Sequence, residues 1–272
     1  MLRRAMAAMI AFSVIQLVPG CKRTKDDGLT YGQARAALDE AELATEAATL
    51  VDGTIEISTS FTIGQAVEAA AQQIRDFVAS QLPCAGITLS GGTLSIEYGK
   101  NPGNCTFKGN TYSGKHSITV SRNNQSDVVV DHTWTEVSNG KLSVSGTAHV
   151  TWSLSAKSRR VEHTLNWTRL SDGKTLTGSG DRTQTVLEGG LAEGLRIDGT
   201  REWKGSAGTW DLAIDGVELR WVDPVPQAGS YVLRTPEDKS LTLSFERVNE
   251  TKIRVTVESG EKRFQFDVTT LG

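Results

Sequence analysis

Four histidines are the residues of this chain whose type and number most directly suggest chemistry. They fall in four successive segments that we predict as strands: His116, His132, His149 and His163. A zinc site needs three or four ligands that converge within about 2.0–2.1 Å of one ion. His149 lies on the polar side of its predicted strand, whereas His132 shares the parity of Val130 and Trp134. We therefore expect ordinary sheet histidines, solvated or hydrogen-bonded, and no metal ion or other cofactor.

No motif marks a catalytic centre. The carboxylates are scattered over turns and polar strand faces, so no pair has the fixed separation that a glycosidase needs. No serine lies in a G-x-S-x-G elbow before a helix. We interpret Gly178, Gly180, Gly189 and Gly190 as turn or bulge glycines, because they precede no helix that could form a phosphate loop. We expect no catalytic residue and a protein that is not an enzyme.

Six tryptophans all lie in predicted strands, mostly beside Val, Leu or Ile of equal parity, which is typical of a core. Three of them are candidates for lining an apolar ligand cavity, or a platform for sugar rings: Trp134, Trp152 and Trp167. A short basic run, Lys157 to Arg160, lies at a predicted hairpin tip. It is either a solvated turn or a contact for anionic lipid or polysaccharide.

The N-terminus predicts export. Arg3 and Arg4 precede a short apolar run from Ala5 to Val18, and Gly20 is the small residue before the predicted cleavage point at Cys21. This layout resembles a bacterial lipobox, in which the cysteine is acylated and becomes the first residue. The apolar run is shorter than the roughly 20 residues of a membrane span. A cleaved signal without lipid and an uncleaved anchor are the alternatives. Lys22 after the cysteine favours the outer membrane, since an acidic residue there retains well-studied bacterial lipoproteins in the inner membrane.

Composition fits an exported protein of moderate size. The formal charge of −3 is mild and mixed, which excludes a strongly basic nucleic-acid binder. With Cys21 acylated, Cys84 and Cys105 remain as an even pair. Outside the cytoplasm such a pair usually oxidises, so we predict a Cys84–Cys105 disulfide.

Helical spacing is confined to the first part of the chain. An alanine-rich stretch from Tyr31 to Leu50 has a weak apolar stripe, and Val51 to Ser60 has the alternation of a short strand. A stronger stripe from Thr62 to Leu82 predicts a helix that ends before Pro83.

From Ile87 onward the hydrophobic period is two. The clearest strand runs from Lys141 to Ser155, with an apolar and a polar side. Dipeptides that favour hairpin turns separate the runs: Asn139-Gly140, Asp172-Gly173, Asp215-Gly216, Asn249-Glu250 and Ser259-Gly260. Pro224 and Pro226 mark a longer connection. Sequential strands joined by tight turns form an antiparallel meander, because no helical pattern separates them.

Several of these strands resemble one group of proteins. The segments are Gly92–Gly99, Cys105, Tyr112–Lys115, Val137–Thr147 and Leu241–Val268. They are similar to the repeated Gly-Thr hairpin signatures of uncharacterised bacterial lipoproteins, many from Bacteroidetes-like genomes. The resemblance spans about Cys84 to Val268 and implies an envelope location and a β-rich fold. That family has no established activity to transfer.

Together these features predict four regions. Residues 1–20 form a lipoprotein signal peptide, 21–30 a flexible tether, 31–83 a helical segment and 84–272 an antiparallel β domain. The fold class is mainly β, a meander that forms a curled sheet, half-barrel or sandwich, with one or two N-terminal helices packed on it. We expect a non-catalytic, lipid-anchored envelope protein with a structural or binding role. Its partners would be the membrane, through the acyl groups, and a surface polysaccharide or lipid. The alternative is a periplasmic carrier of an acyl or other apolar ligand.

Overall fold

The structure is a computed structural model that describes residues 28–59, 67–107, 109–125, 127–153, 155–190 and 192–270. The predicted signal peptide, Cys21 and the first part of the tether lie outside the described residues. So does Thr62, which the sequence places at the start of the second helix.

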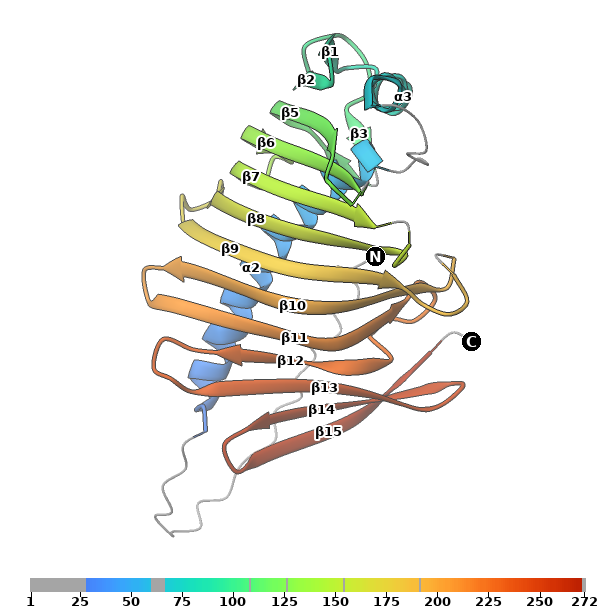
Figure 1. Cartoon of the computed structure of the whole chain (residues 1–272). Helices are drawn as coiled ribbons and strands as arrows, with labels where there is room; N and C mark the ends of the chain where they lie inside the picture. Colours follow the sequence, from blue (N-terminus) through green and yellow to red (C-terminus); the bar gives the residue numbers. More distant parts are fainter. Residues whose placement is uncertain are drawn as a thin grey trace. The chain divides into compact units, whose positions relative to one another are not determined.

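The described chain is mainly β, as the sequence predicts. Two helices, α2 (Tyr31–Thr59) and α3 (Val67–Gln81), precede the strands. The strands are β1 (Gly86–Ser90), β2 (Thr93–Tyr98), β3 (Thr106–Phe107), β4 (Asn110–Thr111), β5 (Ser113–Arg122), β6 (Val128–Ser138), β7 (Leu142–Ser153), β8 (Ser158–Arg169), β9 (Thr175–Val186), β10 (Gly194–Gly205), β11 (Gly208–Arg220), β12 (Ala228–Arg234), β13 (Ser240–Asn249), β14 (Lys252–Ser259) and β15 (Lys262–Thr269). Thirteen strands follow the order β1-β2-β5-β6-β7-β8-β9-β10-β11-β12-β13-β14-β15, and β3 pairs with β4. This sequential order is an antiparallel meander (Figure 1).

The chain divides into two compact units. The first, unit 1, contains Met1–Glu42, Gln184–Glu202 and Ala207–Gly272. The second, unit 2, contains Leu43–Thr183 and Trp203–Ser206. We describe each unit by itself.

Helix α2 corrects one prediction. The stretch from Val51 to Ser60, predicted as a short strand, continues the helix as far as Thr59. Val51 and Ile55 are four residues apart and extend the buried stripe of Ala44 and Ala48. The segment therefore forms a helix, because this conformation buries its apolar stripe, although Ile55 and Ile57 also have the two-residue spacing of a strand.

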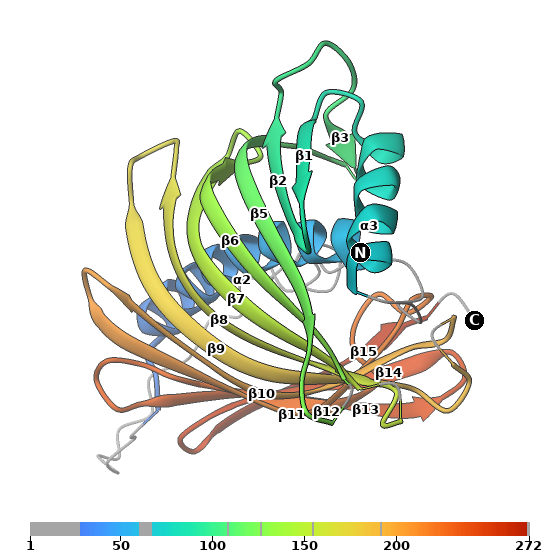
Figure 2. The same ribbon diagram turned by 45° about the horizontal axis from the view of Figure 1, so that its top comes forward.

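In unit 2 the sheet bends, and the part of α2 that belongs to this unit, residues 43–59, runs along the inner side of the bend (Figure 2). Trp134 Nε1 donates a hydrogen bond to Thr54 Oγ1 of the helix at 2.8 Å. Gly53 lies so close to the Tyr112 hydroxyl that a Cβ there would overlap it. A glycine within this helix therefore permits close packing against Tyr112, which lies between β4 and β5. Helix α3 packs against β1, β2 and β5 of the same unit.

The predicted disulfide is present. Cys84 and Cys105 are bonded, with their Cα atoms 5.3 Å apart. The bond ties the segment before β1 to the segment before β3. Such a link stabilises by roughly 3 kcal/mol in the chain-entropy view.

In unit 1 the core lies on one face of β11 to β15. Its two buried clusters are centred on Val217 and on Ile253, both fully buried. Leu29 N donates to Ser259 Oγ at 2.9 Å, and Lys262 Nζ donates to the Leu29 carbonyl at 3.1 Å. Leu29, placed by the sequence in a flexible tether, is therefore held by the ends of β14 and β15.

The predicted turns are mostly in place, with two corrections. Asn139-Gly140, Asp172-Gly173, Asn249-Glu250 and Ser259-Gly260 each fall between or at the ends of paired strands. Asp215-Gly216 does not separate two strands, because β11 is continuous and the register shifts between Asp215 and Glu218. Gly178 and Gly180, interpreted from the sequence as turn or bulge glycines, lie within β9 and therefore not in a turn. A bulge and a turn both use a glycine at positive φ, such as Gly216 at 56°.

Candidate functional site

Two of the four histidines form a buried hydrogen-bonded chain on the inner face of unit 2. Tyr98 of β2 contacts His116 Nδ1 of β5 at 3.1 Å, and His116 Nε2 contacts His132 Nδ1 of β6 at 2.9 Å. The rings of His116, His132 and Trp134 stack with centroids 5.2–5.4 Å apart. The sequence analysis did not predict this pairing. The sequence does contain a signal for the burial of His116, because this residue alternates with Ile118 and Val120 and so lies on the same face of its strand.

Burial determines the protonation state of His116 and His132. Both histidines are at most 2% exposed. Removal from water lowers the pKa of His116 well below 6.5, and the neighbouring His132 lowers it further. Burial lowers the pKa of His132 to about 3, with a smaller contribution from the charge of Arg159. Burial also raises the pKa of the Tyr98 hydroxyl. At neutral pH both imidazoles are therefore uncharged.

Because both imidazoles are uncharged, the donor and the acceptor of each hydrogen bond between Tyr98, His116 and His132 can be assigned. Among the described residues, the only hydrogen-bond partner of the Tyr98 hydroxyl is His116 Nδ1, so Tyr98 satisfies its hydrogen by donating there. His116 then donates from Nε2 to His132 Nδ1. His132 consequently carries its hydrogen on Nε2. That atom is buried and has no hydrogen-bond partner within the described parts of the chain.

The other two histidines are placed as predicted for sheet residues. His149 lies on the polar face and contacts Asp131 through Nδ1 at 2.7 Å. His163 of β8 is half-buried and lies across Ala148 from His132, in one inner-face row. Within the described residues, no three histidine, cysteine or acidic side chains are grouped so that they could hold a metal ion.

The three candidate tryptophans do not form one lining. Trp134 is 2% exposed and bonded to α2, and Trp167 is 5% exposed. Trp152 is half-buried, and the Arg159 guanidinium lies 5.2 Å from the centre of its ring. Trp134 and Trp167 are thus part of the packed interior, whereas Trp152 is near its margin.

The opposite face of unit 2 carries a row of hydroxyl side chains. Register places one such residue in each of five neighbouring strands: Ser95, Ser117, Thr133, Thr147 and Thr164. All but Ser117 are exposed. Neighbouring strands lie about 4.8 Å apart, so the hydroxyl groups recur at that spacing.

One end of this row opens into a pocket of about 330 Å³, which we call the polar-face pocket. It is lined by Gly86, Thr88, Ser95, Ile96, Glu97, Lys100, Lys115, His116, Ser117, Thr133 and Thr135. The lining also includes the buried Ile96 and His116. Lys100 pairs with Glu97 at 3.3 Å and lies across Gly86. Lys115 lies opposite Glu97 in the register.

The pocket offers hydroxyl, ammonium and carboxylate groups at a single concave place. These are donors and acceptors for a polar ligand with many hydroxyl groups. The sequence analysis considered only His116 among these residues, as a candidate metal ligand, because most of the others are ordinary polar residues of alternating strands. Only the cross-strand register brings them together.

No family model, curated protein or solved structure matches this chain. Within the described residues, no helix has both the length and the apolar content that crossing a bilayer requires. The residues themselves therefore carry the functional argument.

Proposed function

We propose that this chain is a lipid-anchored, non-catalytic protein of the bacterial envelope that binds surface polysaccharide in the polar-face pocket. The observation that carries the binding role is the pocket itself, which lies at the end of the hydroxyl row and holds two lysines. Binding is reversible and polar in this proposal, and no bond is made or broken.

The location rests on the sequence. The lipobox-like residues before Cys21 predict acylation, and the strands resemble those of uncharacterised envelope lipoproteins. The Cys84–Cys105 disulfide is consistent with an oxidising compartment outside the cytoplasm. Two or more acyl chains would hold the protein stably on a membrane.

The location is tested by the mass of the mature protein and by a Cys21→Ser variant. Purified from membranes, the N-terminal peptide should begin at Cys21 and carry the mass of acyl chains. The variant should leave the membrane fraction. An unmodified N-terminal peptide would refute the lipid anchor.

The binding role is tested by calorimetric titration with neutral and acidic hexasaccharides. Thr133→Val removes a hydroxyl from the pocket, and its matched control Thr164→Val removes one from the same row outside the pocket. We expect Thr133→Val to weaken binding several-fold, since an unmade hydrogen bond typically costs about 0.5–1.5 kcal/mol. The control should bind like the unchanged protein. Equal loss in both variants, or no binding by the unchanged protein, would contradict the pocket.

The second candidate is a carrier of an acyl or other apolar ligand. A carrier cavity lined by all three tryptophans would leave their rings unpacked. Trp134 is instead bonded to Thr54 of α2, and Trp167 is buried. The packed interior therefore favours the polysaccharide-binding proposal over this alternative.

A further inference from the structure

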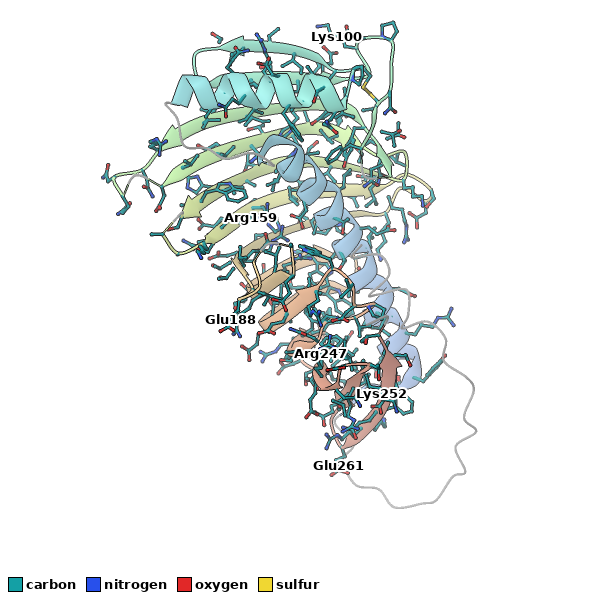
Figure 3. All side chains as sticks on the ribbon, turned by 90° about the vertical axis from the view of Figure 1, so that its right-hand side faces the viewer. Lys100, Arg159, Glu188, Arg247, Lys252 and Glu261 are labelled. Atoms are coloured by element: carbon teal, nitrogen blue, oxygen red, sulfur yellow. A yellow bond between two sulfur atoms is a disulfide. The ribbon has the colours of Figure 1, made fainter. Side chains whose placement is uncertain are left out.

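The last strand of unit 1, β15, lies at an edge of the sheet. It pairs with β14 on one side, and within the described residues no strand pairs with its other side (Figure 1). Figure 3 labels Lys252, where β14 begins, and Glu261, in the turn that leads into β15. An edge strand offers a row of backbone donors and acceptors to another chain, so β15 is a candidate surface for association.

Two of the usual features that prevent edge strands from pairing are missing from β15. Proline, bulges and charged side chains are the common means of blocking an edge. Strand β15 contains no proline, and its eight residues pair with β14 in one register without a shift. Lys262 is the charged residue on its apolar side, and its ammonium already donates to the Leu29 carbonyl at 3.1 Å. The order of the charges on the polar side therefore decides whether this edge repels or accepts another strand.

The backbone groups that face the open side of β15 follow from its pairing with β14. Thr270 N donates to the Thr251 carbonyl at 2.9 Å, in the same register as the strand pairs. Hydrogen-bonded and non-bonded pairs alternate along antiparallel strands, so the even-numbered residues of β15 bond to β14. Arg263, Gln265 and Asp267 consequently direct their N–H and C=O groups away from β14.

One two-fold register satisfies both the backbone groups and the charges of two such strands. If two copies of β15 pair antiparallel about Gln265, Arg263 of each copy lies opposite Asp267 of the other. All of these positions have backbone groups that face outward, so the opposed residues exchange hydrogen bonds. A pairing centred on Arg263 or on Asp267 would instead place like charges opposite each other. The charges of β15 are thus self-complementary in a single register.

Ion pairs already present on the polar face fit this register. Arg263 pairs with Glu258 of β14 at 3.0 Å, and Asp267 pairs with Arg254 of β14 at 3.2 Å. In the two-fold arrangement, each Arg263 also lies beside the acidic Asp267 of the second copy. The charges then alternate in sign across four strands, which is favourable for cross-strand neighbours.

The opposite face of β15 is apolar and continues the core of unit 1. Phe266 and Val268 pack against the buried cluster that contains Ile253. Phe264 is 42% exposed, and its ring centre lies 5.8 Å from that of Phe266. The two-fold register places Phe264 opposite Phe266 of the second copy, and cross-strand aromatic pairs are favourable. The same pairing therefore removes exposed aromatic surface from water.

From these observations we infer that β15 is a dimerisation edge, at which two copies of this chain pair antiparallel about Gln265. Both copies use the same strand, so association stops at two. The inference is independent of the proposed function, because β15 belongs to unit 1 and the polar-face pocket belongs to unit 2.

The first test is the mass of the full-length protein in a non-ionic detergent, measured by sedimentation equilibrium. The range should be about 1–300 μM, because one pair of edge strands is a small interface and small interfaces give weak complexes. We expect monomer and dimer in a concentration-dependent equilibrium. A monomer at every concentration would overturn the inference, and so would open-ended growth beyond the dimer.

Two charge reversals test the register, separately and mixed. Arg263→Glu places acids opposite each other in the dimer, and Asp267→Lys places bases opposite each other. Each variant alone should dimerise at least about tenfold more weakly, since like charges face each other twice. An equimolar mixture should dimerise again, because every opposed pair then has opposite signs. Dimers of either variant alone, or a mixture that stays monomeric, would overturn the register.

The matched control for these reversals is Arg234→Glu. Arg234 is an exposed residue at the end of β12, in the same unit but away from the edge strand. It makes the same change of charge as Arg263→Glu and should dimerise like the unchanged protein. Equal weakening by both variants would attribute the effect to net charge and contradict the edge contact.

Disulfide trapping tests the position of the two-fold axis. Opposed residues of a hydrogen-bonded pair have Cα atoms about 5.5 Å apart, a separation that a disulfide spans. Gln265→Cys should therefore form a covalent dimer under mild oxidation. Thr269→Cys, also exposed on the same strand, should remain monomeric, because this register places its two copies far apart. Trapping of both variants, or of neither, would overturn the inferred axis.

Discussion

Acidification should destabilise unit 2 through the buried histidines. His132 has a pKa of about 3 when folded, against 6.5 for an ordinary histidine. The unfolded chain therefore binds more protons than the folded one between these values, and stability falls as pH falls. The contribution is fully present above pH 6.5. Each pKa unit corresponds to about 1.4 kcal/mol, so His132 alone accounts for a loss of about 3 kcal/mol at pH near 4.5. His116 acts in the same direction.

The assay is urea unfolding at several pH values between about 7 and 4.5, followed by tryptophan fluorescence, since Trp134 stacks on both histidines. Carboxylates also contribute to acid destabilisation, so the comparison is between variants. His132→Phe should lose about 3 kcal/mol less over this range than the unchanged protein. Parallel pH dependence of the unchanged protein and His132→Phe would refute the reasoning.

Three substitutions in unit 2 give further expected outcomes. Asp52→Asn removes the ion-pair partner of Arg182, which is 2% exposed, and should cost about 3–5 kcal/mol of unfolding free energy by chemical denaturation; a smaller loss with Arg182→Met also present would identify the stranded charge as the cause. Thr54→Val leaves Trp134 Nε1 without its acceptor and should cost about 1–3 kcal/mol, and an unchanged melting curve would contradict the helix–sheet bond. Gly146→Ala should cost roughly 1–3 kcal/mol, because Gly146 has φ of 146° and a Cβ there would meet the backbone of the next strand; wild-type stability would exclude this strain.

The sequence by itself determined much of the fold. Alternation along β7 specified its buried face, and dipeptides such as Asn139-Gly140 specified where strands turn. The number of cysteines specified the disulfide, because only Cys84 and Cys105 remain once Cys21 is assigned to acylation. These features are local or depend only on counting, so they require no knowledge of which strands are neighbours.

The sequence analysis was wrong where a local pattern had two readings. Val51 to Ser60 alternates like a strand, yet its valine and isoleucine also fit a helical stripe, and packing on the sheet selected the helix. Asp215-Gly216 has the composition of a hairpin turn, and a bulge within β11 uses the same residues.

Only the tertiary structure determined the buried histidine pair and the polar-face pocket. His116 and His132 are 16 residues apart, so their meeting depends on cross-strand register. The same register aligns Ser117 with Thr133 at the polar-face pocket. Alternation gives the face on which a side chain lies but not its neighbour in the next strand. That neighbour depends on bulges such as the one between Trp134 and Val137, which arise only when the strands pair.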